Sequence, residues 1–119
     1  MMIWIRVASV LMFLAVGLGA FGAHAIRGRI SDYYLYVYKT AVLYQFIHAL
    51  GLFVVAWLST INSDPKITCA GFLMVAGIII FSGSLYVLSL SGIKWLGAFT
   101  PIGGLCFLAS WICLIIVKF

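Results

Sequence analysis

A tyrosine, a glutamine and a histidine lie close together inside a long apolar stretch of the sequence. Tyr44 and His48 are four residues apart and Gln45 and His48 are three apart, so in a helix all three side chains project from one side. Burying such groups in hydrocarbon without hydrogen-bond partners costs several kcal/mol, so they must face another helix or water. An ionisable residue inside a membrane-spanning segment is a functional candidate.

Polar residues in the later apolar stretches are the expected partners of these three side chains. A structural hydrogen-bond network is the favoured interpretation, and a ligand, proton or ion pathway is the alternative. Haem ligation is disfavoured, because a single buried histidine would need an oligomer or a different second ligand. We define the intramembrane polar cluster as Tyr44, Gln45, His48, Ser82, Ser84, Tyr86 and Thr100.

The remaining ionisable residues give no catalytic arrangement. His24 stands at the end of the first apolar stretch, several helical turns from the depth of His48, so a two-histidine metal site is not expected. Asp32 and Asp64 have the positions of helix-start residues, which leaves no intramembrane carboxylate pair and no nucleophile beside a base. We therefore predict no enzymatic activity, no metal and no cofactor.

The three cysteines are expected to be chemically inert. Cys69, Cys106 and Cys113 all fall within apolar stretches, and no CxxC or Cys/His spacing appears. Neither a zinc site nor a disulfide framework is therefore indicated. Cys106 and Cys113 are two helical turns apart on one face, and cysteine commonly serves as a small buried hydrophobe.

Composition places the chain in a membrane. Of its 119 residues 66% are hydrophobic and only 8% are charged, against roughly a quarter charged in ordinary globular domains. A soluble domain of this size could not bury so much apolar surface, so lipid is an expected partner. The net charge of +5 comes from single basic residues near segment ends, which fits lipid headgroups and not nucleic acid. The expected interfacial residues are His24, Arg27 and Arg29.

Four apolar stretches fill almost the whole chain and predict four helical spans in one transmembrane domain, residues 1–119. Each is long enough to cross a hydrocarbon core of about 30 Å. The first ends in Ala23-His24-Ala25, which resembles a signal-peptidase site; because three further spans follow, we expect a retained helix. The predicted spans are about 4–23, 33–59, 66–90 and 95–117.

Short connections predict an all-α, up-down-up-down four-helix bundle with both termini on one side of the membrane. Asp64 as N-cap and Pro65 at the first helical position are a strong start signal for the third helix. In the fourth span, Thr100 could cap a helix that begins at Pro101, or Pro101 could kink a helix that begins near Trp95. We favour a fourth helix that is broken or kinked at Pro101.

Small residues recur on single helix faces, which indicates close helix packing. Helices in lipid depend on backbone approach at such residues when they associate. Ala15 and Gly19 share one face, as do Gly77 and Ser84. Packing within the chain and a seam between copies are both open. The glycines expected at helix contacts are Gly19, Gly22, Gly77, Gly83, Gly103 and Gly104.

Four motifs in order are similar to one known family. They are Gly19–His24, Tyr44-Gln45 with His48, Phe81–Tyr86, and Thr100-Pro101 with Gly103-Gly104 and Phe107-Leu108. Together they resemble the YgdD-like small integral membrane proteins, a domain of unknown function (number 423) with eukaryotic relatives. The resemblance covers essentially the whole chain. It implies a multi-pass protein of the bacterial cytoplasmic (inner) membrane, but no known activity, substrate or cofactor.

Orientation follows from the resemblance and not from charge. Three basic residues lie on the terminal side and four on the other, which the positive-inside rule cannot decide. The resemblance implies basic C-termini that place both ends in the cytoplasm, and this chain ends in Lys118-Phe119.

For function, we expect a non-enzymatic structural, oligomeric or accessory membrane component that forms a homo-oligomer or joins a larger membrane complex. The alternative is a small transporter, channel or lipid-binding protein with a polar cavity around His48.

Overall fold

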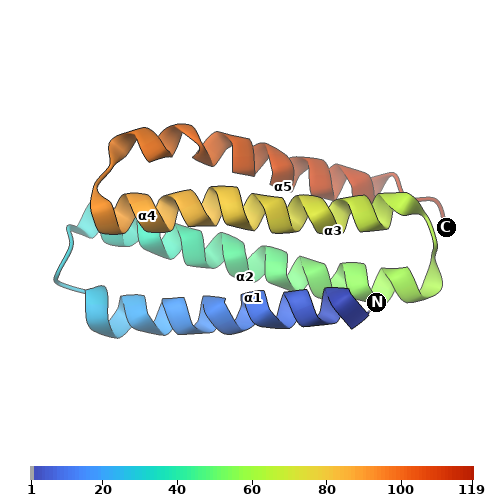
Figure 1. Ribbon diagram of the computed structural model, residues 1–119, viewed down its shortest axis with the longest axis horizontal. Coiled ribbons are helices and arrows are strands. Elements are labelled where there is room, and N and C mark those ends of the chain that lie inside the picture. The colour runs from blue at the N-terminus through green and yellow to red at the C-terminus, as the bar shows by residue number, and fades with distance from the viewer. Residues whose placement is uncertain (1) are drawn as a thin grey trace.

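Four helical spans run side by side along the molecule in a computed structural model that describes residues 2–119 (Figure 1). They extend over Met2–Ile26, Asp32–Ile61, Pro65–Ser91 and Lys94–Ile115. Each is long and apolar enough to cross a bilayer, since about 20 residues at 1.5 Å per residue span the hydrocarbon core. The predicted all-α membrane fold is therefore confirmed.

Three of the four spans change helix type along their length. The first span is α1 (Met2–Phe21) followed by the π-helical turn η1 (Gly22–Ile26), and the second is the unbroken α2 (Asp32–Ile61). The third contains a π-helical turn, η2, in its middle. It consists of α3 (Pro65–Gly77), η2 (Ile78–Ser82) and α4 (Gly83–Ser91). The fourth begins as the 3₁₀ helix η3 (Lys94–Ala98) and continues as α5 (Thr100–Ile115).

A side-chain cap begins α3 at Asp64, where the sequence predicts it, and another begins α2 at Ser31. The Ser31 hydroxyl accepts a hydrogen bond from the backbone N–H of Tyr34 at 3.2 Å. The Asp64 carboxylate accepts one from the N–H of Lys66 at 3.0 Å. Each cap satisfies a backbone donor that has no partner inside the helix. At the other end of the third span, Gly92 takes the left-handed conformation (φ 73°) that ends a helix.

The fourth span is broken immediately before Pro101, as predicted. Phe99 separates the 3₁₀ turn from α5, and Pro101 occupies the first turn of α5, where its missing N–H leaves no hydrogen bond unmade. Thr100 does not cap this helix. Its hydroxyl is instead 2.7 Å from that of Ser84 in α4, so the break supplies a contact between the third and fourth spans.

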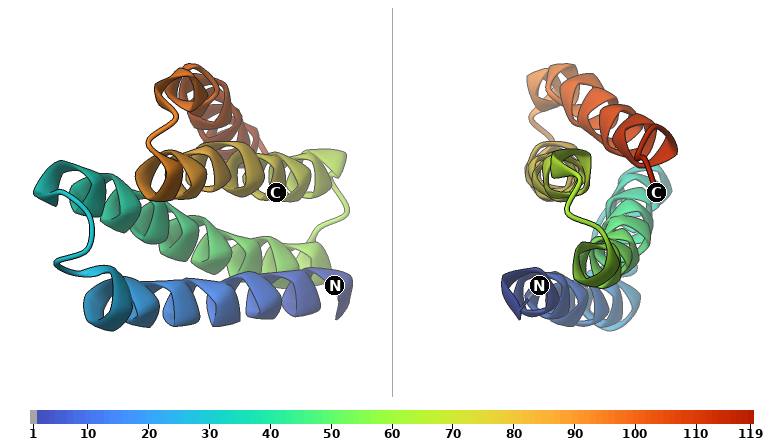
Figure 2. Two further views of the ribbon diagram at one scale, coloured as in Figure 1. Left: turned by 60° about the vertical axis from the view of Figure 1, so that its left-hand side comes forward. Right: turned by 90° about the vertical axis from the view of Figure 1, so that its right-hand side faces the viewer.

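Successive spans are antiparallel, and the described ends of the chain lie at the same end of the molecule (Figure 1). α1 packs along α2, and α2 also contacts α3 and α4. α5 packs mainly on α3 and η2, on the far side of the third span from α1 (Figure 2). The bundle is therefore elongated and flat, with principal extents of 48 × 26 × 17 Å.

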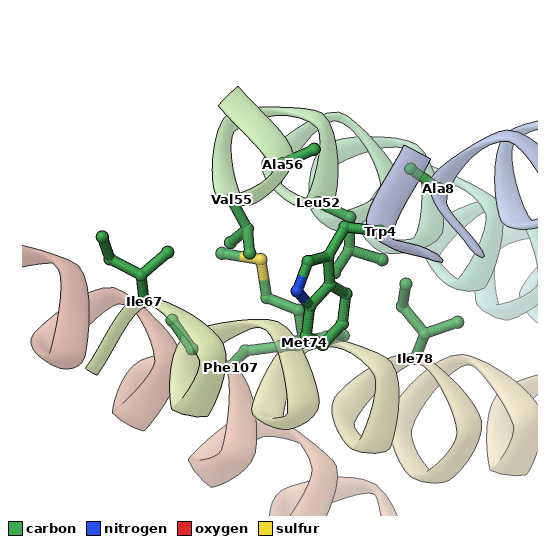
Figure 3. Packing of buried hydrophobic residues seen from close by; sticks show 10 residues of the cluster. Trp4, Ala8, Leu52, Val55, Ala56, Ile67, Met74, Ile78 and Phe107 are labelled. Atoms are coloured by element: carbon green, nitrogen blue, oxygen red, sulfur yellow. The ribbon is translucent and has the colours of Figure 1, made fainter. Parts of the chain in front are cut away.

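The largest apolar core joins the first three spans near the terminal end, with Phe107 of α5 at its edge (Figure 3). Trp4 reaches from α1 to α3, where it covers Gly71. A Cβ on that glycine would come within 2.6 Å of the indole ring. Leu52 and Met74 are fully buried between α2 and α3. This core fixes the register in which α2 presents its polar side chains to its neighbours.

Candidate functional site

Gln45 connects three of the four spans at mid-membrane depth. Its side chain is only 2% exposed. The amide nitrogen donates to the Leu11 carbonyl of α1 at 2.8 Å, and the amide oxygen accepts a hydrogen bond from the Tyr86 hydroxyl of α4 at 2.6 Å. Both ends of the amide are therefore used inside the protein, which offsets the cost of placing it in hydrocarbon.

A second hydrogen bond ties α2 to α1 two helical turns further along. The Tyr38 hydroxyl donates to the Leu18 carbonyl, and Leu18 lies seven residues after Leu11 on the same face of α1. The Tyr38 ring also packs edge-on against Tyr86, with ring centroids 5.3 Å apart. Gly22 leaves the space for Tyr38, because a Cβ there would overlap the ring.

His48 is buried and has both ring nitrogens engaged. Its Nδ1–H donates to the Tyr44 carbonyl at 2.8 Å, and its Nε2 accepts from the indole N–H of Trp111 at 2.9 Å. This pattern requires the neutral imidazole with its proton on Nδ1. The ring stacks on Phe107 with a centroid separation of 3.5 Å and is 3% exposed. No nitrogen of this histidine is free to accept a proton or bind a ligand.

Trp111 is the member of this site that sequence reasoning missed. It lies seven residues after Gly104 and so on the same helix face, which was the only signal available. Tryptophan in a membrane helix more often marks the interface, where its N–H meets water. Here Trp111 lies deeper than the interface, away from water, so its N–H needs an acceptor within the protein.

The serines and the threonine of the polar cluster bond elsewhere. Ser82 is fully buried and donates to the Ala41 carbonyl of α2 at 2.8 Å. Ser84 pairs with Thr100. Of the partners suggested for Gln45 and His48, only Tyr86 is in place. The cluster is thus a set of separate links between helices, and every buried side-chain N or O atom in residues 2–119 has a hydrogen-bond partner.

Tyr44 differs from the rest of the cluster, since its side chain is 37% exposed. Its ring packs on Phe81 at 4.6 Å, but its hydroxyl makes no hydrogen bond to any described residue. It borders an open hollow of about 530 Å³ between α2 and α5, whose other walls include His48, Phe107 and Trp111. The hollow is mainly apolar and opens toward the lipid side of the bundle.

The six glycines expected at helix contacts have different surroundings. A Cβ on Gly77 would overlap the Phe107 ring, and one on Gly103 would overlap the backbone nitrogen of Phe81. Gly22 makes room for Tyr38, as described above. A Cβ on Gly19 would meet Val42 at 3.4 Å and one on Gly104 would meet Phe81 at 3.9 Å, which are ordinary contact distances. A Cβ on Gly83 would meet no atom within 4 Å, so Gly83 faces outward from the single chain.

The predicted interfacial residues lie at the end of the molecule opposite the termini. His24 belongs to η1, and Arg27 and Arg29 to the connection that follows; all three are exposed. Among residues 2–119, no three His, Cys, Asp or Glu side chains lie close enough together to hold one metal ion.

A second polar arrangement, at the terminal end, centres on Asp64. Its carboxylate accepts hydrogen bonds from the N–H groups of Lys66 and of Lys118, the latter at 3.1 Å. The Lys66 ammonium is 3.4 Å away. The two backbone hydrogen bonds, that of Lys66 first, hold the pKa of this carboxyl below its ordinary value. Asn62 adds a bond from its side-chain amide to the Lys118 carbonyl at 2.7 Å.

Comparison with known proteins identifies relatives over the full chain. The profile of a family described as "Protein of unknown function (DUF423)" matches residues 18–104. UPF0382 membrane protein YwdK of Bacillus subtilis (strain 168) is 51% identical over 98% of this chain and 95% of its own length. UPF0382 membrane protein SAB0533 of Staphylococcus aureus is 48% identical, and SH2409 of Staphylococcus haemolyticus 45%, each over 100% of this chain and 97% of the relative. No solved structure matches.

Proposed function

This chain belongs to the DUF423 family of membrane proteins, and we propose that it is a non-enzymatic structural component of the membrane, which associates with further copies of itself or with a larger membrane complex. The observation that carries the proposal is the use of the intramembrane polar groups. His48 has a partner at each ring nitrogen, and Gln45 has one at each end of its amide. These groups hold helices together and leave no set of polar atoms with which to transform a substrate.

Two outward-facing glycines support self-association. Gly17 of α1 and Gly83 of α4 have open space where a Cβ would be, on faces that a single chain turns toward lipid. Each borders a shallow hollow, of about 440 Å³ beside Gly17 and about 280 Å³ beside Gly83. A helix of a neighbouring protein can bring its backbone close at such positions, which is how helices associate in lipid.

Association is tested by counting subunits in lipid. The protein would be labelled with one fluorophore and reconstituted at falling protein-to-lipid ratios, and single-molecule photobleaching would give the number of copies per particle. We expect particles of two or more copies, and a shift toward single copies in Gly17→Leu or Gly83→Leu. Ala20→Leu, which also adds bulk at an exposed position of α1 but borders neither hollow, is the matched control.

Strictly single copies at every ratio, together with no co-purifying protein after extraction from native membrane in mild detergent, would contradict the proposal.

A second candidate function is lipid binding in the hollow beside Tyr44. The observation that favours it is a hydroxyl at mid-membrane depth with no partner in the described chain, on the wall of a cavity of about 530 Å³. Sites for small apolar ligands have volumes of this order and a few polar groups. Native mass spectrometry would show a retained lipid that Tyr44→Phe weakens, while Tyr33→Phe, at the membrane surface, leaves it unchanged.

We place the protein in the bacterial cytoplasmic membrane with both termini in the cytoplasm. Arg6, Lys66 and Lys118 then lie on the cytoplasmic side, next to anionic lipid. Reporter fusions at the C-terminus test this orientation, with a fluorescent protein that matures inside and a phosphatase that is active only outside. Phosphatase activity at that end would reverse the assignment.

A further inference from the structure

Two cysteines from different spans lie side by side at the terminal end of the bundle. The sulfur atoms of Cys69 in α3 and Cys113 in α5 are 3.9 Å apart, and both are free thiols. The two helices pack along each other over much of their length. We propose that Cys69 and Cys113 form a dithiol site that a small disulfide, of the class of oxidised glutathione, converts to an intramolecular disulfide joining α3 to α5.

The pair lies near the membrane–water interface, where a water-soluble disulfide can approach it. Cys69 is exposed and lies one helical turn after Lys66, about 4.5 Å deeper at 1.5 Å per residue. Cys113 is partly buried beside it and stands five residues before Lys118. Since the ammonium groups of Lys66 and Lys118 belong at the headgroup level, both sulfurs lie just beneath the membrane surface.

The polar arrangement around Asp64 holds the two sulfurs together. Asp64 accepts a hydrogen bond from the start of α3 at Lys66 and another from the C-terminal Lys118. Asn62 donates to the carbonyl of Lys118 as well. These bonds, which we call the Asp64 clamp, tie the first turn of α3 to the chain end that follows α5. Cys69 lies three residues after Lys66, and Cys113 lies five residues before Lys118.

The chemistry is two successive thiol–disulfide exchanges. The thiolate of Cys69, the more exposed of the two, attacks one sulfur of the small disulfide, so that a mixed disulfide forms and one thiol leaves. Cys113, next to it, then attacks the Cys69 sulfur and releases the second thiol. In total one dithiol and one disulfide give one protein disulfide and two small thiols; the two protons lost by the cysteines are taken up by the two leaving groups.

Cys106 provides an internal control. It lies seven residues before Cys113 on α5, about 10.5 Å deeper in the membrane, and it has no sulfur neighbour among the described residues. The exchange reaction should therefore leave it as a free thiol.

The test is to treat the reduced protein, reconstituted in lipid vesicles, with oxidised glutathione and to follow it by intact-mass and peptide mass spectrometry. We expect the loss of two hydrogens, a fall from three free thiols to one, and a peptide that links Cys69 to Cys113. In Cys113→Ser the reaction should stop at glutathione on Cys69, while Cys106→Ala should behave as the wild type.

The rate of ring closure is the second measurement. Asp64→Ala, which opens the clamp, should slow closure several-fold after the mixed disulfide has formed, whereas Asp32→Ala, at the other end of the bundle, should not. A stable glutathione adduct on wild-type Cys69, a disulfide between two chains, or a reaction at Cys106 in place of Cys113 would overturn the assignment. Closure at an unchanged rate in Asp64→Ala would overturn the role of the clamp.

Discussion

The indole N–H of Trp111 in α5 points at Nε2 of His48 in α2, 2.9 Å away, and this hydrogen bond joins two helices whose backbones have little direct contact. Phe107, one helical turn before Trp111 on α5, stacks on the imidazole of His48. The fourth span is therefore attached to the second through side chains, and to the third through backbone approach at glycine.

We predict a measurable coupling between Trp111 and His48. Trp111→Phe leaves Nε2 without a donor, and an unsatisfied buried group costs about 1–3 kcal/mol. A double-mutant cycle with His48→Phe isolates the hydrogen bond itself, for which about 0.6 kcal/mol is the average in membrane proteins. Unfolding of the protein in mixed micelles by rising mole fractions of a denaturing detergent gives the four free energies. Strict additivity would show that the contact contributes nothing.

Two tyrosine hydroxyls allow a matched comparison. Tyr86→Phe removes the donor to the Gln45 amide oxygen and should lower the free energy of unfolding by about 1 kcal/mol. Tyr44→Phe removes a hydroxyl that has no partner in the described chain, so stability in detergent should stay within about 0.5 kcal/mol of the wild type. A larger loss of stability in Tyr44→Phe than in Tyr86→Phe would contradict the hydrogen bond between Tyr86 and Gln45.

Glycine-to-alanine substitutions should divide according to the space above each glycine. Gly103→Ala drives a methyl group into the backbone of η2 at Phe81, where nothing can rotate away, and should cost about 1–3 kcal/mol or more. Gly83→Ala points into open space and should be neutral, or stabilising by up to about 1 kcal/mol. Thermal unfolding of the detergent-solubilised variants separates them. In detergent, at a dilution that leaves the protein as single copies, equal losses at both positions would contradict the open space above Gly83.

The Asp64 clamp should open in acid. Its hydrogen bonds lower the pKa of the folded carboxyl below the ordinary value of 3.8, so the unfolded chain binds the proton more tightly. The resulting stability is present above pH 3.8 and is lost as the pH falls through the lower pKa of the folded state. Hydrogen exchange at the N–H of Lys66 and Lys118 should therefore speed up below about pH 4, relative to amides elsewhere, at matched intrinsic rates.

Asp64→Asn is the control for that measurement. It keeps an oxygen that can accept one of the hydrogen bonds but does not titrate, so the excess exchange in acid should disappear. A pH dependence that survives this substitution would assign the effect to another group.

The number and type of helices could be predicted because the solvent is hydrocarbon. A backbone that cannot bond to lipid must bond within its own helix, so apolar stretches of the right length become spans. Asp64-Pro65 and Ser31 mark helix starts through local chemistry alone, and both caps are present. The break at Pro101 also followed from a local rule, the missing N–H of proline.

The partners within the polar cluster depended on how the helices rotate and shift against each other, which local sequence does not determine. Tyr86 is one of four candidate partners for Gln45 and His48, and residue type alone does not select it for Gln45. The acceptors at Leu11, Leu18 and Ala41 are backbone carbonyls, which every residue has, so the residue type does not indicate which of them accepts a hydrogen bond. The pairing of Cys69 with Cys113 likewise appears only when α3 and α5 are in register.

The π-helical turn η2 carries one residue more than an α-helical turn would need, because its hydrogen bonds reach from residue i to i+5. Residues before and after such a turn keep the faces they would have in a straight helix one residue shorter. If one of Ile78, Ile79 or Ile80 is deleted, the third span can therefore fold as a continuous α-helix. Tyr86 would still be directed at Gln45. The same deletion inside α3 would swing everything beyond it by about 100°. The middle of the third span is thus where this chain can change its length during evolution without losing its fold.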